Sequence, residues 1–485
     1  MMARPRSILL LCADMAAAVH FSCYGGPAGL TPAVDALAAN GMRFTNGYCA
    51  CPPCIPARAS MMCGQYGHTH GKSAHLKMAL APPPALLPEI LAANGYRTGI
   101  VGKTHWWPPE ADLGCHDAFL TIDNHLSPEL GEHDAYLHFL RERGLFHYDP
   151  ATWQAQKERI EARNLPFACS KVNWTGDTAC RLLEHYARGD EPFFLFCSFV
   201  EPHGGSCDAL RNAPEALRSR LEAVPLPAII EDRGEHKPEP QRRAVRELWN
   251  RRTAEKQAYR RDVFNDIALV DRNIGRILRK ADDLGLGDDL LALFTTDHGD
   301  LMFDHGCIEK TVLYERAIRV PFIVRGPGVP RGESRQQFAS HVDLLPTLLD
   351  HAGIPERREW NIEGRSLLPV VRDAGQPGRE YLYCESEQTQ HLRPLVRSCQ
   401  SKAVRHGDLK YIYTLVDGHL EYEELYDLAA DPEELDNLVP CGRFGAEREH
   451  LRRELLRWLT VTELSRLHPV AENHYHVPRI DKEFL

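Results

Sequence analysis

The sequence lacks an apolar run long enough to cross a bilayer, and it has no internal repeat and no low-complexity tract. It also lacks a block of basic residues with interleaved aromatic residues, and its formal net charge is -10. Proteins that bind nucleic acids usually present a basic face to the phosphates, so this charge does not favour such a partner. These absences argue against a membrane-spanning protein, a repeat protein and a basic nucleic-acid-binding protein.

No export signal is evident in the sequence. Residues 7–12 follow two arginines, but this apolar run is short, leads directly to Asp14 and precedes no clear cleavage site. We interpret the run as a buried strand and predict a cytoplasmic location. The 15 cysteines are odd in number and scattered, which is typical of reduced thiols rather than of a disulfide framework.

One group of cysteines is denser and leaves two alternatives open. Cys49, Cys51, Cys54 and Cys63 lie close together in sequence, as zinc ligands often do, but a second paired knuckle is lacking. Cys51 and Cys54 also have the C-x-x-C spacing of redox proteins, without the βαβ context of a thioredoxin. Neither alternative explains the polar residues elsewhere in the chain.

Short apolar runs without alternation predict the buried strands of a parallel sheet. They lie at residues 7–12, 98–101, 193–200, 290–295 and 320–324. Helical patterns lie between them, at residues 32–39, 88–93, 261–280 and 344–351. Strands that alternate with helices predict an α/β fold with a large, mostly parallel sheet flanked by helices.

The pattern changes near residue 370. Strands are predicted at residues 380–385, 410–415 and 419–425, followed by an amphipathic helix at residues 446–459. We therefore predict a catalytic domain at residues 1–372 and a C-terminal α+β subdomain at residues 373–485. Two long insertions, near residues 106–174 and 204–255, leave from predicted strand ends and are candidate walls of a site.

Polar residues follow four of the predicted strands. Each one alone is more typical of a helix cap or a solvated loop, but ligands of open α/β sheets bind outside the carboxyl ends of the strands. In chain order the residues are Asp14, then Lys103 and His105, then Glu201 and His203, then Asp297 and His298.

This set of side chains suits a metal-assisted reaction of an oxyanion. Asp14, Asp297 and His298 could share one divalent cation, because carboxylates and imidazoles bind hard and borderline ions. Lysines add positive charge for an anion, and histidines titrate near neutrality and can transfer protons.

Several motifs occur in one order along the chain. Residues 54–58 read CIPAR, residues 95–105 read GYRTGIVGKTH, residues 201–203 read EPH and residues 296–300 read TDHGD. Lys310 is followed by AIRVP at residues 317–321, DLLPT at residues 343–347 and LYDL at residues 425–428. With these motifs the chain resembles the sulfatase family of the alkaline phosphatase superfamily almost from end to end.

The resemblance implies an alkaline phosphatase-like fold and a sulfatase that hydrolyses a small-molecule or saccharide sulfate ester. A formylglycine-generating or anaerobic maturation enzyme would convert Cys54 to formylglycine, and one hydroxyl of its hydrate would attack sulfur. The implied metal ligands are Asp14, Cys54, Asp297 and His298, and the implied catalytic residues are Cys54, Arg58, Lys103, His105, His203 and Lys310.

The implied roles divide the reaction. Arg58 and Lys103 hold the hydrated residue, and His203 and Lys310 bind the sulfate oxygens and protonate the leaving alcohol. His105 then takes a proton from the second hydroxyl, which expels sulfate and restores the aldehyde.

One position departs from the family pattern. Met15 stands where the family usually has an oxygen ligand, and a thioether is a poor ligand for a hard cation. Ca2+ is the expected ion, with Mn2+ and Mg2+ as alternatives. A phosphonate monoester hydrolase or phosphodiesterase of the same superfamily, and a sulfate-ester-binding protein without turnover, stay open as functions. The sequence also leaves open whether the protein forms a homo-oligomer.

Overall fold

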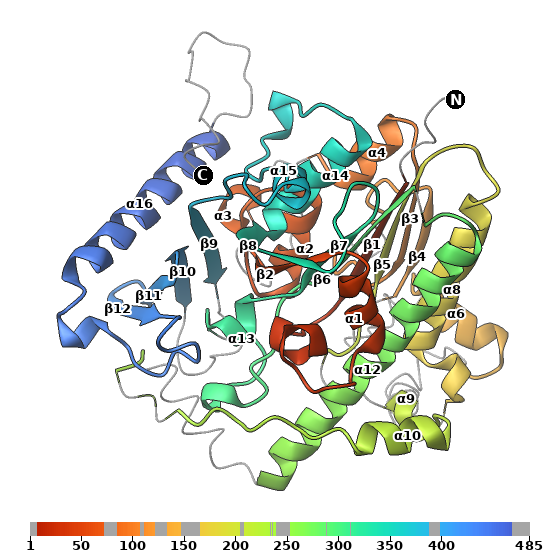
Figure 1. Ribbon diagram of the computed structural model, residues 1–485, viewed down its shortest axis with the longest axis horizontal. Helices are drawn as coiled ribbons and strands as arrows, with labels where there is room; N and C mark the ends of the chain where they lie inside the picture. The colour runs from red at the N-terminus through yellow and green to blue at the C-terminus, as the bar shows by residue number, and fades with distance from the viewer. Residues whose placement is uncertain are drawn as a thin grey trace.

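The computed structural model describes residues 7–71, 85–106, 111–121, 133–146, 165–203, 208–232, 234, 236–238, 253–287, 289–310, 312–387 and 398–467. Its eight-stranded sheet has the order β4-β3-β5-β1-β6-β7-β2-β8 and lies between layers of helices (Figure 1). The strands are β1 (Ser7–Ala13), β2 (Met42–Tyr48), β3 (Arg97–Gly102), β4 (Asp117–Leu120), β5 (Phe193–Ser198), β6 (Leu290–Thr296), β7 (Phe322–Arg325) and β8 (Glu333–Ser340).

The helices of this part are α1 (Pro32–Ala39), α2 (Cys54–Cys63), α3 (Gly67–His70), α4 (Leu87–Ala93), α6 (Ala135–Glu142), α8 (Lys171–Tyr186), α9 (Asp208–Arg211), α10 (Glu215–Glu222), α12 (Thr253–Asp283), α13 (Glu315–Ile318), α14 (Leu344–Ala352) and α15 (Leu368–Arg372). The four predicted helices are confirmed as α1, α4, α12 and α14. The helix α12 extends beyond the predicted residues 261–280 at both ends.

The predicted parallel strands are confirmed for β1, β3, β5 and β6, which pair in parallel. The fifth predicted strand, β7, pairs antiparallel with β6, so its assignment to a parallel set was wrong. Among its described residues, the chain between β6 and β7 contains only the short helices of residues 304–306 and 315–318. Without a crossover helix the chain turns back beside β6 in the opposite direction.

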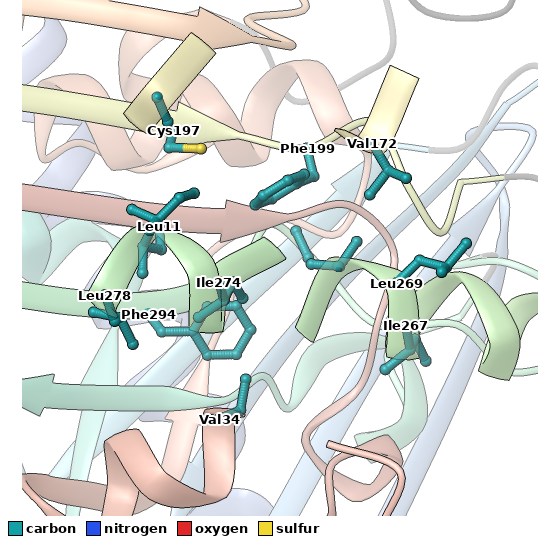
Figure 2. Packing of buried hydrophobic residues seen from close by; sticks show 14 of the residues in the cluster. Leu11, Val34, Val172, Cys197, Phe199, Ile267, Leu269, Ile274, Leu278 and Phe294 are labelled. Atoms are coloured by element: carbon teal, nitrogen blue, oxygen red, sulfur yellow. The ribbon is translucent and has the colours of Figure 1, made fainter. Parts of the chain in front are cut away.

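The central strand β1 is buried on both faces, which is why its sequence shows no alternation. Leu9 and Leu11 belong to a core with the helices α1, α8 and α12, whereas Ile8 and Leu10 belong to a second core with α4 and α14. Figure 2 shows Leu11 in the first core, near apolar residues of α12. Helices on both faces therefore fix the position of this strand and of the residues that follow it.

A second, four-stranded antiparallel sheet follows, with the order β12-β11-β10-β9. Its strands are β9 (Tyr381–Glu387), β10 (Cys399–His406), β11 (Leu409–Val416) and β12 (Leu420–Asp427), and the helix α16 (Gly445–Leu467) packs on it through Trp458 (Figure 1). The small sheet and its helix are confirmed, although β10 was not predicted and α16 is longer than expected. The division between residues 372 and 373 stays a prediction.

In the described part of the chain, no helix combines the length and the apolar character that crossing a membrane requires. The two insertions predicted to form walls are described only in part. Residues 107–110, 122–132, 147–164, 204–207, 233, 235 and 239–252 lie outside the described residues.

A buried ion-pair group joins α3 to the second sheet. Glu385 on β9 accepts hydrogen bonds from the backbone N and from Nδ1 of His68, both at 2.8 Å, and it also pairs with Lys402. Burial opposes the charge of His68, but Glu385 outweighs burial and raises the pKa of the imidazole above its ordinary value of 6.5. A raised folded-state pKa stabilises the fold below the unfolded pKa, and this stabilisation is lost as the pH rises through the folded pKa.

We therefore expect His68→Asn to lower the free energy of unfolding most below pH 6.5 and progressively less at alkaline pH. Urea unfolding of both proteins at several pH values measures this difference. His406→Asn is the control, because the side chain of His406 is 43% exposed where it pairs with Glu380, and ion pairs near the surface contribute little to stability. A cost that does not change with pH would show that His68 acts through packing alone.

Candidate active site

Four adjacent parallel strands carry polar residues to one edge of the large sheet. In the order β3-β5-β1-β6, Lys103 follows β3, Ser198 ends β5, Asp14 follows β1 and Asp297 follows β6. All four side chains are buried. The structure therefore brings the predicted residues Asp14, Lys103 and Asp297 together, as expected, at the edge where open α/β sheets bind ligands.

The helix α2 carries Cys54 and Arg58 to the same edge. Cys54 is the first helical residue and Arg58 lies four residues later, so both project from one face. Pro56 occupies the first turn, where a backbone N–H would have no partner within the helix. Every residue of α2 is buried. The spacing of the CIPAR motif is thus the spacing of one helical turn.

Four side chains form a compact group that could hold a metal ion. One donor atom from each of Asp14, Cys54, Asp297 and His298 lies within 4.8 Å of the others, and all four residues are buried. His298 Nε2 lies 3.0 Å from Cys54 Sγ, while its Nδ1 lies 2.9 Å from the carbonyl of Gly299. That second contact orients the ring so that Nε2 faces the group.

Among the described residues this is the only such group, and it does not include Cys49, Cys51 or Cys63. All described cysteines are free thiols. The structure therefore gives no support to the zinc and redox alternatives.

Two cations hold the carboxylates in place. Arg58 donates from Nη2 to Asp14 Oδ2 and from Nε to Asp297 Oδ2, both at 2.9 Å. Lys103 Nζ lies 2.6 Å from Asp14 Oδ2. Burial would raise the pKa of Asp14, but Lys103, His203 and Arg58 outweigh burial and hold this pKa well below its usual range. Both carboxylates therefore turn Oδ2 toward Arg58.

The Oδ1 atoms face the candidate metal position. Asp14 Oδ1 lies 3.7 Å and Asp297 Oδ1 3.5 Å from His298 Nε2. Burial lowers the pKa of His298 to about 4, although Asp297 opposes this effect, so the ring is neutral and can act as a ligand. Two carboxylate oxygens and an imidazole nitrogen fit a divalent cation.

Met15 adds no oxygen to this group. Its backbone is left-handed, with φ 52°, and its N–H donates to Asp297 Oδ1 at 3.0 Å. Its sulfur lies 3.9 Å from Lys310 Nζ. Met15, which stands where the family usually has an oxygen ligand, thus places a thioether beside Lys310.

Lys310 contacts both Cys54 and His203. Lys310 Nζ lies 3.4 Å from Cys54 Sγ and 3.4 Å from His203 Nε2. His105 follows Lys103 by two residues and is half-buried, with a left-handed backbone (φ 54°). The roles assigned to these residues stay predictions.

The sequence analysis missed one residue of this site. Ser198 Oγ accepts a hydrogen bond from Arg58 Nη1 at 2.7 Å, and the same Nη1 donates to the carbonyl of Lys103 at 2.8 Å. Ser198 is the polar residue that ends the apolar run of β5, so its position at a strand end was the available signal.

The chain is similar to known proteins along most of its length. The arylsulfatase of Clostridium perfringens is 26% identical over 473 residues, covering 88% of this chain and 89% of the relative. The N-acetylglucosamine-6-O-sulfatase of Bacteroides thetaiotaomicron is 25% identical over 524 residues, covering 95% and 86%. The crystal structure of the phosphonate monoester hydrolase of Agrobacterium radiobacter has a TM-score of 0.74 at 22% identity, covering 96% of this chain and 97% of that chain, and so shows a shared fold.

Two family models match the chain. The model for the C-terminal part of N-sulphoglucosamine sulphohydrolase matches residues 303–460. The Sulfatase model matches residues 6–354, which include all of the site residues described above. The chain therefore belongs to the sulfatase family.

Proposed function

We propose that this protein hydrolyses a sulfate monoester through a formylglycine formed from Cys54, beside a bound divalent cation. The observation that carries the proposal is the setting of Cys54 Sγ. His298 Nε2 lies 3.0 Å, Lys310 Nζ 3.4 Å and Asp14 Oδ1 3.9 Å from this atom. A candidate metal group and a cation thus meet at one nucleophile position.

The unmodified thiol is poorly suited to the reaction. Burial, together with Asp14, raises the pKa of Cys54 to about 12, although Lys310 opposes this effect. A thiol of this pKa is protonated near neutrality and is a weak nucleophile. Conversion to formylglycine replaces it with a hydrated aldehyde that offers two hydroxyls.

A divalent cation held by Asp14, Asp297, His298 and an oxygen of the modified residue would lower the pKa of the hydroxyl and offset charge on the sulfate. The expected ion is Ca2+, with Mn2+ and Mg2+ as alternatives. The carboxylate Oδ1 atoms and His298 Nε2 support a divalent cation at this position, because they face one another, but they do not distinguish between these ions.

The chain's own residues would bind the sulfate and move the protons. In the first step a hydroxyl of residue 54 loses its proton to water, its oxygen bonds to sulfur, and the bond from sulfur to the alcohol oxygen breaks. His203 and Lys310 would together bind the sulfate oxygens and protonate the leaving alcohol. Burial opposes the charge of Lys310, but Cys54, Glu309 and Asp14 outweigh burial and raise the pKa of its ammonium.

The second step restores the aldehyde. The remaining hydroxyl of residue 54 loses its proton to His105, the bond from carbon to the sulfate oxygen breaks, and sulfate leaves. Splitting one difficult displacement into two easier ones is the general advantage of covalent catalysis.

We further propose a sulfated small molecule or saccharide as the substrate class. The relative named N-acetylglucosamine-6-O-sulfatase supports the saccharide. The maturation enzyme, the cytoplasmic location and the oligomeric state stay predictions.

A second candidate function is phosphonate monoester hydrolysis, because the phosphonate monoester hydrolase of Agrobacterium radiobacter shares the fold. The motif that contains Lys103 and His105 favours the sulfatase. Lys103 contacts Asp14 at 2.6 Å and so belongs to the site. The ratio of kcat/KM for an aryl sulfate and the matched aryl phosphonate separates the two functions.

The first test is the mass of the peptide across Cys54, in protein produced beside a formylglycine-generating enzyme, followed by assay on that pair of esters. An aldehyde at residue 54 with preferred turnover of the sulfate supports the proposal. A thiol that persists while a control sulfatase in the same cells is converted would contradict it and favour a binding protein without turnover.

Removal of the divalent ion is expected to lower both activity and stability. An ion that binds the folded state alone, at a free concentration of about 100 times its Kd, adds about 2.7 kcal/mol to the free energy of unfolding. Unfolding should therefore occur at a lower temperature after dialysis against a chelator and recover when the ion returns. Asp297→Asn is the control, because the chelator should shift its unfolding temperature less. An unchanged unfolding temperature of the unaltered protein would argue against a bound ion.

A further inference from the structure

The loop that leads to Lys310 has an unusual backbone. In residues 299–310 four residues other than glycine are left-handed, a conformation that costs each of them free energy relative to the ordinary regions. They are Met302 (φ 43°), Phe303 (φ 70°), His305 (φ 54°) and Glu309 (φ 57°). Contacts of the folded protein must therefore hold the loop in this shape.

Asp300 makes such contacts across the loop. Its Oδ1 accepts hydrogen bonds from the backbone N of Met302 at 3.0 Å and of Glu309 at 2.8 Å. Its Oδ2 accepts a hydrogen bond from the hydroxyl of Tyr259 on α12 at 3.0 Å. The backbone adds one bond, from the N of Leu301 to the carbonyl of Glu309 at 2.8 Å. One buried carboxylate thus ties the start of the loop to its end and the whole loop to a helix.

The end of the loop is where the chemistry lies. Glu309 directly precedes Lys310, whose Nζ lies 3.4 Å from Cys54 Sγ. Lys310 is itself buried, so its ammonium has little freedom to compensate for a displaced backbone. A displacement of about 1 Å at a reacting centre can cost about 100-fold in rate.

We propose that Asp300 is a positioning residue that fixes the ammonium of Lys310 against residue 54. It does so because its Oδ1 accepts hydrogen bonds from the backbone N–H groups of both Met302 and Glu309, which fixes the two ends of the loop relative to each other. The inference rests on the proposed function, because Lys310 is taken to bind the sulfate and to stabilise the leaving alcohol.

The test compares Asp300→Ala with Asp300→Asn in the full-length, formylglycine-containing protein. The asparagine oxygen can still accept both backbone hydrogen bonds, whereas alanine cannot. Turnover is measured on aryl sulfates whose leaving phenols differ in pKa. Asp300→Ala should lower kcat by about 100-fold for the poorest leaving groups and progressively less for better ones. Asp300→Asn should recover most of this loss, and Lys310→Ala should show the same dependence on the leaving group.

Asp304→Asn is the matched control on the same loop. Asp304 is also buried, but its side chain accepts a hydrogen bond from the backbone N of Ile230 and forms an ion pair with Arg260. It is not hydrogen-bonded to the backbone N of Glu309, which Asp300 holds. It should lower the unfolding temperature without changing the dependence on the leaving group. Equal losses for all leaving groups in Asp300→Ala, or no recovery in Asp300→Asn, would overturn the proposal. An inactive unaltered protein would instead contradict the proposed function, so the two failures are distinguishable.

Discussion

Cys54→Ala is expected to lower kcat for an aryl sulfate by about 10⁶-fold, the loss seen when a covalent nucleophile is removed. Alanine can form neither the aldehyde nor the hydrate, so no covalent sulfate can form. The fold should persist, because the thiol lies among the polar atoms of His298, Lys310 and Asp14 rather than in an apolar core. Kinetics on the protein matured with a formylglycine-generating enzyme, together with its unfolding temperature, measure both effects.

Cys63→Ala is the matched control. Cys63 ends the same helix, is equally buried and belongs to an apolar core, outside the candidate metal group. It should retain most of the activity and lose stability through the cavity that it leaves. If Cys54→Ala kept an appreciable rate on the aryl sulfate, residue 54 would not be the nucleophile.

In the large sheet, the strands that the sequence predicted are buried along nearly their whole length. The run of β1 is apolar throughout because helices cover both of its faces. The missed strands give a weaker signal. β8 is an edge strand of mostly polar residues, ESRQQFAS, and β2 contains Asn46-Gly47, which resembles a turn. A strand that leaves one face to solvent, or that carries a glycine where another part of the backbone packs closely against it, does not appear in the sequence as an apolar run.

Much of the site could be predicted because it follows the ends of such strands. Asp14, Lys103 and Asp297 are close in space because the strands that they follow, β1, β3 and β6, belong to the run of four parallel strands β3-β5-β1-β6. The contacts of Arg58 with both carboxylates could not be predicted, since they depend on how α2 is placed over that edge. The hydrogen bonds of Asp300 belong to a loop whose left-handed residues have no sequence signature.

Arg58→Met is expected to lower the free energy of unfolding by about 3–5 kcal/mol, the cost of breaking a buried ion pair by removing one partner. Arg58 is 1% exposed and bridges Asp14 and Asp297, so methionine would leave both carboxylates without their shared cation. Asp14 would keep Lys103, at 2.6 Å, whereas Asp297 would lose its only ion-pair partner other than His298 among the described residues. Asp297 is therefore the carboxylate that should change most.

The activity should also fall, because Asp297 is a candidate metal ligand. Arg58→Lys should recover little, since an ammonium cannot reproduce the forked contacts of the guanidinium with both carboxylates. Arg379→Met is the matched control, because Arg379 is buried and donates to Asp343 and to the hydroxyl of Tyr66, outside the candidate metal group. Both variants should lose stability in urea unfolding, but only Arg58→Met should bind the divalent ion more weakly in a calorimetric titration. Equal ion affinities in the two variants would mean that Arg58 supports the fold alone, and the one-helical-turn spacing of the motif would then need another explanation.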